Sequence, residues 1–186
     1  GMRFSFPNHA VSFSQRLFYS VIALFLAFVV CFMAFQYRRE KDYKVELLNT
    51  QLQYYNDKFS EYLLQQDTLD THLLEQYVKR HHLDDLRVTL IDSQGKVIYD
   101  NLSKNPGLFK NHLNRTEIKQ AIQSGSGYAI HRLSEIVGGE FFYSARQYPE
   151  LGIIIRSALP YNVSLIQSLS TDPHYIWFTA IISSVL

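Results

Sequence analysis

The chain has 186 residues, a net charge of +1 at pH 7 and a pI of about 8.0, so it lacks the strong positive charge expected of a nucleic-acid-binding protein. Cys31 is the single cysteine, which excludes a disulfide framework within the chain and a thiolate metal site.

Residues 17–36 are predicted to form a membrane-spanning helix, preceded by a short tail at residues 1–16. The core of this segment, LFYSVIALFLAFVVCFMAF, contains no charge, proline or glycine. As a helix it is roughly 28 Å long, close to the roughly 30 Å of a bilayer's hydrocarbon core. A buried core helix is disfavoured because the segment has no polar face, and a cleaved signal peptide because it is too long and ends without a small-residue cleavage site.

The next segment, residues 37–66, contains no proline or glycine and predicts a continuation of the helix. Apolar residues recur three and four positions apart in a heptad pattern. They are Val45, Leu48, Leu52, Tyr55, Phe59 and Tyr62. This seam has two interpretations: a stalk that pairs with a second copy, or an amphipathic helix that packs on its own domain. Both hold if the N-terminal part pairs and the C-terminal part packs.

A second helix and a strand pair are predicted next. The helix covers residues 71–82, and its inward residues are Leu73, Leu74, Tyr77, Val78 and His81. His81 and His82 are adjacent and point to different sides of a helix, so they do not indicate a metal site. Period-two alternation then predicts strands at residues 86–91 and 96–99, joined by a turn that ends at Gly95.

A third helix and three more strands complete the predicted domain. The helix covers residues 114–124, with Asn114 as its N-cap, Glu117 at the capping-box position and Gly125 at its end. The strands are expected at residues 128–133, 140–148 and 153–159, with hairpin turns at Gly138-Gly139 and at residues 149–152, and with Pro160 ending the last strand.

The last residues are predicted to return to the membrane. Residues 161–169 are expected to form a short helix. Residues 175–186 are apolar and preceded by Asp172-Pro173, a helix-start signal. Twelve apolar residues are too few to span a bilayer as a helix, so we expect a second membrane helix that continues past Leu186.

The predicted fold class is α+β: a PAS-like five-stranded antiparallel sheet behind a long N-terminal helix, flanked by two transmembrane helices. Residues 37–174 form the domain between them. Such an arrangement favours a device that reports across a bilayer.

Four stretches carry a family resemblance. Residues 87–100 (RVTLIDSQGKVIYD) resemble the opening of the PAS-like sensor domain in bacterial sensor histidine kinases of the phosphate-regulation type. Residues 111–118 (NHLNRTEI) resemble the helix that follows, and residues 143–145 (YSA) and 155–160 (IRSALP) resemble the closing strands. Some of these motifs are shared with chemoreceptors and cyclases that use the same input module.

The resemblance implies a homodimer in the bacterial inner membrane, with a cytoplasmic tail and an extracytoplasmic sensor. A Lys/Arg count alone would place the large domain in the cytoplasm, but long loops translocate largely regardless of charge. The resemblance further implies a kinase core beyond Leu186 that uses ATP and Mg²⁺ and phosphorylates a response regulator. No catalytic residue, cofactor site or metal site is expected in these 186 residues.

Two other functions remain open. In the same class, the segment is the input domain of a chemoreceptor or a cyclase. In a different class, it is a membrane-anchored interaction domain that recruits a partner and has no signalling output.

The sequence does not name the stimulus, but one hypothesis is a pocket for a small anionic ligand, and arginines carry this hypothesis. Strand alternation places Arg132, Arg146 and Arg156 each on one face of its own strand, so we expect their guanidinium groups to converge if the strands pair as hairpins. His131 and Tyr143 are predicted to assist. The alternative is that the arginines are solvated or paired with acidic residues, namely Glu135, Glu140 and Glu150. His112 and Arg115 are expected to pack at the start of the third helix, or else to contact ligand.

Overall fold

The computed structural model describes residues 12–132 and 139–161, together with residues 181 and 184. The chain forms two compact units, one of Gly1–Lys41 with Leu165–Leu186 and one of Asp42–Ser164. The predicted short helix at 161–169 lies outside the described residues except for Tyr161, which belongs to a strand. The predicted second membrane helix is described only at residues 181 and 184, and Asp172-Pro173 lies outside the described residues.

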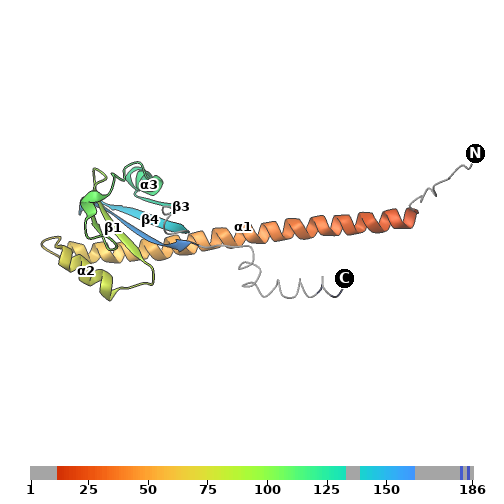
Figure 1. The fold of residues 1–186 in the computed structure, drawn as a ribbon, viewed down its shortest axis with the longest axis horizontal. Helices are drawn as coiled ribbons and strands as arrows, with labels where there is room; N and C mark the ends of the chain where they lie inside the picture. Colours follow the sequence, from red (N-terminus) through yellow and green to blue (C-terminus); the bar gives the residue numbers. More distant parts are fainter. Residues whose placement is uncertain (1–11, 133–138, 162–180, 182–183, 185–186) are drawn as a thin grey trace, which may run out of the picture. The chain divides into compact units, whose positions relative to one another are not determined.

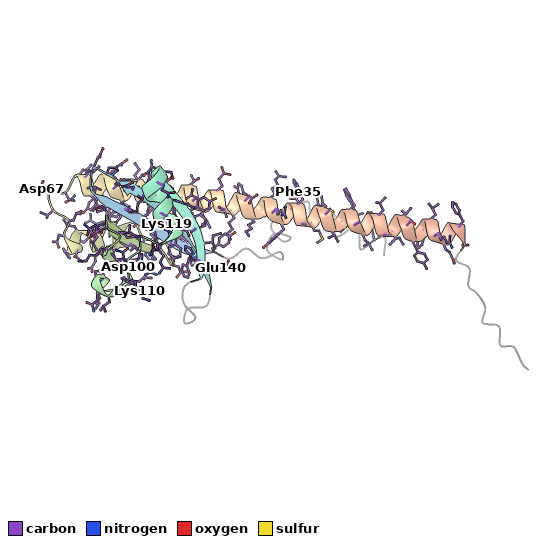
Figure 2. The ribbon with its side chains drawn as sticks, turned by 90° about the horizontal axis from the view of Figure 1, so that it is seen from above. Phe35, Asp67, Asp100, Lys110, Lys119 and Glu140 are labelled. Atoms are coloured by element: carbon purple, nitrogen blue, oxygen red, sulfur yellow. The ribbon has the colours of Figure 1, made fainter. Side chains whose placement is uncertain are left out.

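Helix α1, Phe13–Leu64, is a single helix of 52 residues. Its N-terminal part is long and apolar enough to cross a membrane, with a mean hydropathy of 2.6. Most apolar side chains of this part are exposed; Figure 2 labels one of them, Phe35, which is 62% exposed. Large exposed apolar side chains suit lipid better than water. The helix prediction for residues 17–66 is therefore confirmed to within two residues at its end.

The second unit is an α+β domain with the expected elements, a long N-terminal helix and a five-stranded antiparallel sheet (Figure 1). Its elements after α1 are α2 (Thr71–Arg80), β1 (Arg87–Asp92), β2 (Val97–Asp100), the 3₁₀ turn η1 (Pro106–Leu108), α3 (Thr116–Ser124), β3 (Ser126–Arg132), β4 (Glu140–Tyr148) and β5 (Ile153–Tyr161). The strand order is β2-β1-β5-β4-β3, so α3 connects the two edge strands.

The sheet is covered on both faces. One face packs against α1 and α2 through apolar residues that include Phe59, Tyr77, Leu90 and Phe142. The other face packs against α3 around Ile118, and this second cluster consists of Ile91, Val97, Ile118, Ala121, Ala145 and Ile154. Successive strand residues point to opposite faces, which is why Ile153 and Ile155 join the first cluster and Ile154 joins the second.

The heptad seam of α1 belongs to the domain core. Leu52 and Phe59 are fully buried against the sheet, and Tyr55 is 7% exposed. Val45, Leu48 and Tyr62 are partly buried against the same cluster. Of the two interpretations of the seam, packing on the chain's own domain is the one the structure shows. Figure 2 labels Asp67 just after α1, at the opposite end of the domain from Glu140.

Several local predictions need correction. His81 is exposed instead of inward, because it caps the C-terminus of α2 and stacks on Tyr77 from outside. Pro160 does not end the last strand, which continues to Tyr161. The reason is that β1 begins at Arg87, opposite Ala158; beyond that point β5 has only β4 beside it, so a proline without an N–H removes no bond to β1.

Two turn predictions have different outcomes. The turn at 149–152 is confirmed, with Gly152 in the left-handed region at φ 65°. Of the other predicted turn, Gly138 lies outside the described residues.

Candidate functional site

A buried ion pair lies between the sheet and α3. Arg156 of β5 donates from Nη1 to Oε1 of Glu117 in α3 at 3.1 Å. The Glu117 side chain is fully buried and that of Arg156 is 4% exposed. Burying two charges is costly unless each is held by several good contacts, so such a pair is an unusual feature of a domain core.

Two of the predicted ligand-binding residues complete the surroundings of this pair. His131 of β3 lies 2.9 Å from Oε2 of Glu117 through its Nε2 atom. The ring of Tyr143 in β4 lies 4.7 Å from the Cζ atom of Arg156, a cation–π distance. The rings of His131 and Tyr143 are 5.6 Å apart. Residues from three strands and one helix therefore meet at Arg156.

The polar contacts continue across the sheet to its other edge. Arg156 Nη2 donates to Thr89 Oγ1 at 3.3 Å, and Thr89 Oγ1 donates to Oδ2 of Asp100 at 3.0 Å. Arg87 completes the series with a 2.9 Å ion pair to the same carboxylate. We call this set the charge cluster; its members are Arg87, Thr89, Asp100, Glu117, His131, Tyr143 and Arg156.

The electrostatics of the charge cluster favour the ionised pair. Burial acts to raise the pKa of Glu117, but the Arg156 guanidinium and the hydrogen bonds from His131 and Arg156 together hold that pKa below its ordinary value. Nearby, His112 is 4% exposed. Its pKa is lowered, first by burial and then by repulsion from Arg156, so its imidazole is neutral at pH 7. His112 Nδ1 lies 2.6 Å from the Lys110 carbonyl, consistent with the predicted packing role.

One atom of the cluster has no partner. Among the described residues, nothing hydrogen-bonds the Nε atom of Arg156, although that atom is buried. An unpaired buried donor costs about 1–3 kcal/mol. The guanidinium therefore retains one donor that a small acceptor group would satisfy.

The predicted convergence of Arg146 with Arg156 is wrong. In the β4–β5 register Arg146 pairs with Ile155, and Arg156 pairs with Ala145, so the two arginines point to opposite faces of the sheet. Arg146 lies on the α1 face and makes a 3.0 Å ion pair with Asp57. It also lines an open groove of about 350 Å³ formed by α1 and the β4–β5 turn.

Arg132 ends β3, where its backbone pairs with Glu140, and its side chain lies outside what the structure describes. The counter-ions that the structure gives to the other two arginines are Glu117 and Asp57. They are not the three acidic residues that the alternative proposed, of which Glu135 lies outside the described residues.

Sequence reasoning missed Glu117 as a site residue. It was predicted to be a capping-box residue, but α3 begins at Thr116, Arg115 occupies the N-cap without a side-chain bond, and Glu117 points into the core. The available signal was its position, because Glu117 shares one face of α3 with Ile118 and Ala121, both fully buried. A carboxylate on the apolar face of a helix predicts a buried cationic partner.

A second polar region joins α1 to β4 on the other face of the sheet. Ser144 accepts a 2.7 Å bond from Gln53 and donates to Asn49, and Asn56 donates to the Ser144 carbonyl at 3.1 Å. Within the described residues, Gln53 Oε1 and Asn56 Oδ1 are buried without hydrogen-bond partners. We call these four residues the α1–β4 polar seam. The contact between α1 and β4 is therefore polar and includes two unpaired acceptors, where an apolar contact would be expected.

The described residues contain no group of three His, Cys, Asp or Glu side chains that could hold a metal ion.

No protein-family model matches the sequence, and no curated protein does either. Among solved structures, the extracellular domain of the proposed histidine kinase rpHK1S-Z16 is 15% identical, with a TM-score of 0.39 over 50% of this chain and 38% of that chain. The periplasmic sensor domain of a chemotaxis protein is 13% identical, with a TM-score of 0.43 over 66% of this chain and 96% of that chain. With TM-scores below 0.5, neither structure assigns a function.

Proposed function

We propose that this chain is the membrane-anchored input region of a bacterial two-component sensor histidine kinase, with residues 37–174 as an extracytoplasmic sensor domain. One observation carries the proposal. The helix that contains the apolar span is the same helix that supplies Leu52 and Phe59 to the domain core. A change in packing at the sheet therefore acts on a helix that continues to the span without a break.

The α1–β4 polar seam supports a signalling mechanism. Packed contacts change between discrete arrangements. The two unpaired acceptors, Gln53 Oε1 and Asn56 Oδ1, each carry a desolvation penalty, which an arrangement that gives them partners would relieve. A stimulus would favour one arrangement of α1 against β4 by its difference in affinity for the two arrangements. Displacement of α1 then reaches the membrane.

The orientation of the domain gives a direct test. Fusing alkaline phosphatase or green fluorescent protein after Tyr161 should give high phosphatase activity and no fluorescence in a bacterial host, because only exported phosphatase becomes active. A fusion after Gln15, ahead of the span, is the matched control and should give the reverse.

Fluorescence from the Tyr161 fusion would place the domain in the cytoplasm, as the Lys/Arg count suggests, and would contradict an extracytoplasmic sensor. The coding sequence past Leu186 tests the output. A histidine box and a glycine-rich ATP site support the kinase, with ATP, Mg²⁺ and a response regulator as its partners. A cyclase motif or a long charged coiled coil supports a different receptor class, and a stop codon supports the anchored interaction domain.

A small anion is the proposed ligand of the charge cluster. The structure brings together Arg156, His131 and Tyr143, and the free Nε donor of Arg156 supports binding of a carboxylate or phosphate there. We expect inorganic phosphate or a dicarboxylate at 100 times its Kd to stabilise the fragment 42–164 by about 2.7 kcal/mol, which raises Tm by several degrees. Arg156→Gln should abolish the shift, and Arg146→Ala, on the other face, should retain it.

The anion proposal fails if none of these anions shifts Tm, or if the shift persists in Arg156→Gln. If only Arg146→Ala lost the Tm shift, the result would indicate that the anion binds in the groove beside Asp57 instead.

A further inference from the structure

Helix α1 presents an apolar face that the domain does not use. Within the second unit, Tyr43 is 62% exposed, Leu47 is 53% exposed and Tyr54 is 64% exposed. Thr50, also exposed, lies between them, so the spacing of the four residues is four, three and four. This is the spacing of a coiled-coil seam. We call these four residues the outer α1 stripe.

The outer α1 stripe lies on the side of the helix away from the sheet. Tyr43 and Leu52 are nine residues apart, which is two and a half turns, so their side chains point in opposite directions. Leu52 is fully buried in the domain core. The heptad seam from Val45 to Tyr62 therefore faces the sheet. The outer α1 stripe is the apolar face of this part of α1 that remains accessible.

The charge pattern of this face is unusual for a solvent-exposed helix. Residues 47–56 (LLNTQLQYYN) contain no charged side chain. Surface helices of soluble domains normally carry charges on their solvent side. Further along, Lys58 and Glu61 neutralise each other in a 3.3 Å ion pair, and the Lys58 ammonium lies 5.5 Å from the Tyr54 ring. The remaining charge up to Glu61 is Asp57, which pairs with Arg146 of β4, so the four residues of the outer α1 stripe are uncharged and the charges beyond them are paired.

We infer that the outer α1 stripe is the surface on which a second copy of this chain docks, in a parallel helix pair. This inference rests on the proposed function, because anchoring in one membrane holds two copies parallel and at high effective concentration. In a parallel two-fold contact each side chain meets its own equivalent, so any charge in the seam would face a like charge. A neutral stripe of Tyr, Leu, Thr and Tyr fits such a self-contact, whereas a different, charged partner would gain nothing from it.

Cysteine cross-linking tests the geometry, with the full-length chain expressed in membranes. In a Cys31→Ser background, single cysteines replace Leu47, Thr50 or Tyr54, with Val45 and Leu48 as controls on the opposite face. A disulfide requires Cβ atoms about 3.8 Å apart, so we expect oxidation to link the stripe positions about tenfold faster than the controls. Faster linking at the two control positions, or no linking at any position, would overturn the inference.

Charge pairing gives a second, independent test. Leu47→Lys and Leu47→Glu should each reduce dimer formation, because like charges face each other, and co-expression of the two variants should restore it as a mixed dimer. Glu46 is the control position, where the native chain already carries the negative charge. Dimer formation should be similar for the native chain, for Glu46→Lys and for the two co-expressed. Failure of the mixed pair to recover would contradict a self-contact at Leu47.

The outcome is separable from that of the proposed function. Counting subunits by single-molecule photobleaching in membranes reports the oligomeric state without reference to α1. A dimer whose stripe positions do not cross-link overturns only this inference. A monomer overturns both this inference and the homodimer part of the proposed function, whereas the phosphatase fusion tests the orientation alone.

Discussion

Arg156→Met is expected to lower the free energy of unfolding of the fragment 42–164 by about 3–5 kcal/mol, because it leaves the buried carboxylate of Glu117 without its cation. Glu117 is fully buried, so water cannot replace the guanidinium. The unpaired group must protonate in the folded state, or the α3 face must open. Urea denaturation at pH 7, followed by circular dichroism, measures the change in midpoint.

Arg146→Met is the matched control. It removes the same kind of side chain from the neighbouring strand, but its partner Asp57 is 41% exposed, so we expect a loss of at most about 1 kcal/mol. The double variant Glu117→Leu/Arg156→Met should recover most of the stability lost in Arg156→Met, because both charges are gone. Equal losses in the two arginine variants, or additive losses in the double variant, would contradict a coupled buried pair.

The pH dependence of the free energy of unfolding also tests the ion pair between Glu117 and Arg156. The folded-state pKa of Glu117 lies below its unfolded value, so the unfolded chain binds more protons. The stabilisation is therefore complete above the unfolded pKa and is lost as pH falls through the lowered folded pKa. We expect Glu117→Gln, compared with the native fragment, to be less stable at pH 7 and to show a weaker loss of stability below about pH 4.5. Parallel stability curves for the two proteins would argue against an ionised Glu117.

Phe59→Ala is expected to cost about 3–5 kcal/mol, the largest effect of a single truncation in α1. Phe59 is fully buried, and its ring stacks on Tyr77 of α2 at a centroid distance of 4.6 Å. Its removal leaves a cavity between α1, α2 and the sheet. The measurement is again urea denaturation of the fragment 42–164, at a concentration where it is monomeric.

Tyr54→Ala is the control for the truncation, because it removes an aromatic ring from the same helix at a position that is 64% exposed. We expect a change within about 0.5 kcal/mol in the monomer. If Phe59→Ala were as mild as Tyr54→Ala, α1 would not belong to the domain core, and the route from the sheet to the span would lose its basis.

The sequence predicts most of the elements because their signals are local. The bounds predicted for β4, residues 140–148, agree with the structure, and α3 ends at Gly125 in the left-handed conformation expected of a C-terminal cap. Apolar periodicity, glycine and proline act over a few residues, so a single sequence suffices for them. The N-terminus of α3 was mispredicted because Asn114 and Glu117 fit a capping box by spacing alone.

The charge cluster was not predictable in the same way. Glu117 and Arg156 are 39 residues apart in the chain, and their contact depends on how β5 pairs with its neighbours. A shift of one residue in the β4–β5 register exchanges the two faces of a strand, so alternation alone did not separate Arg146 from Arg156. Likewise the heptad pattern of α1 is the same for a paired stalk and for a helix that packs on a sheet.

Helix α1 is one continuous helix that contains both the apolar span and the core-facing seam. Each residue of an α-helix advances by about 100°, so a single insertion between residues 36 and 42 would turn the seam by that angle relative to the span. Seven inserted residues return it to within about 20°. If signalling passes along α1 as proposed, we expect insertions of about seven residues between residues 36 and 42 to be tolerated better than single insertions, and helix-preserving substitutions there to have little effect.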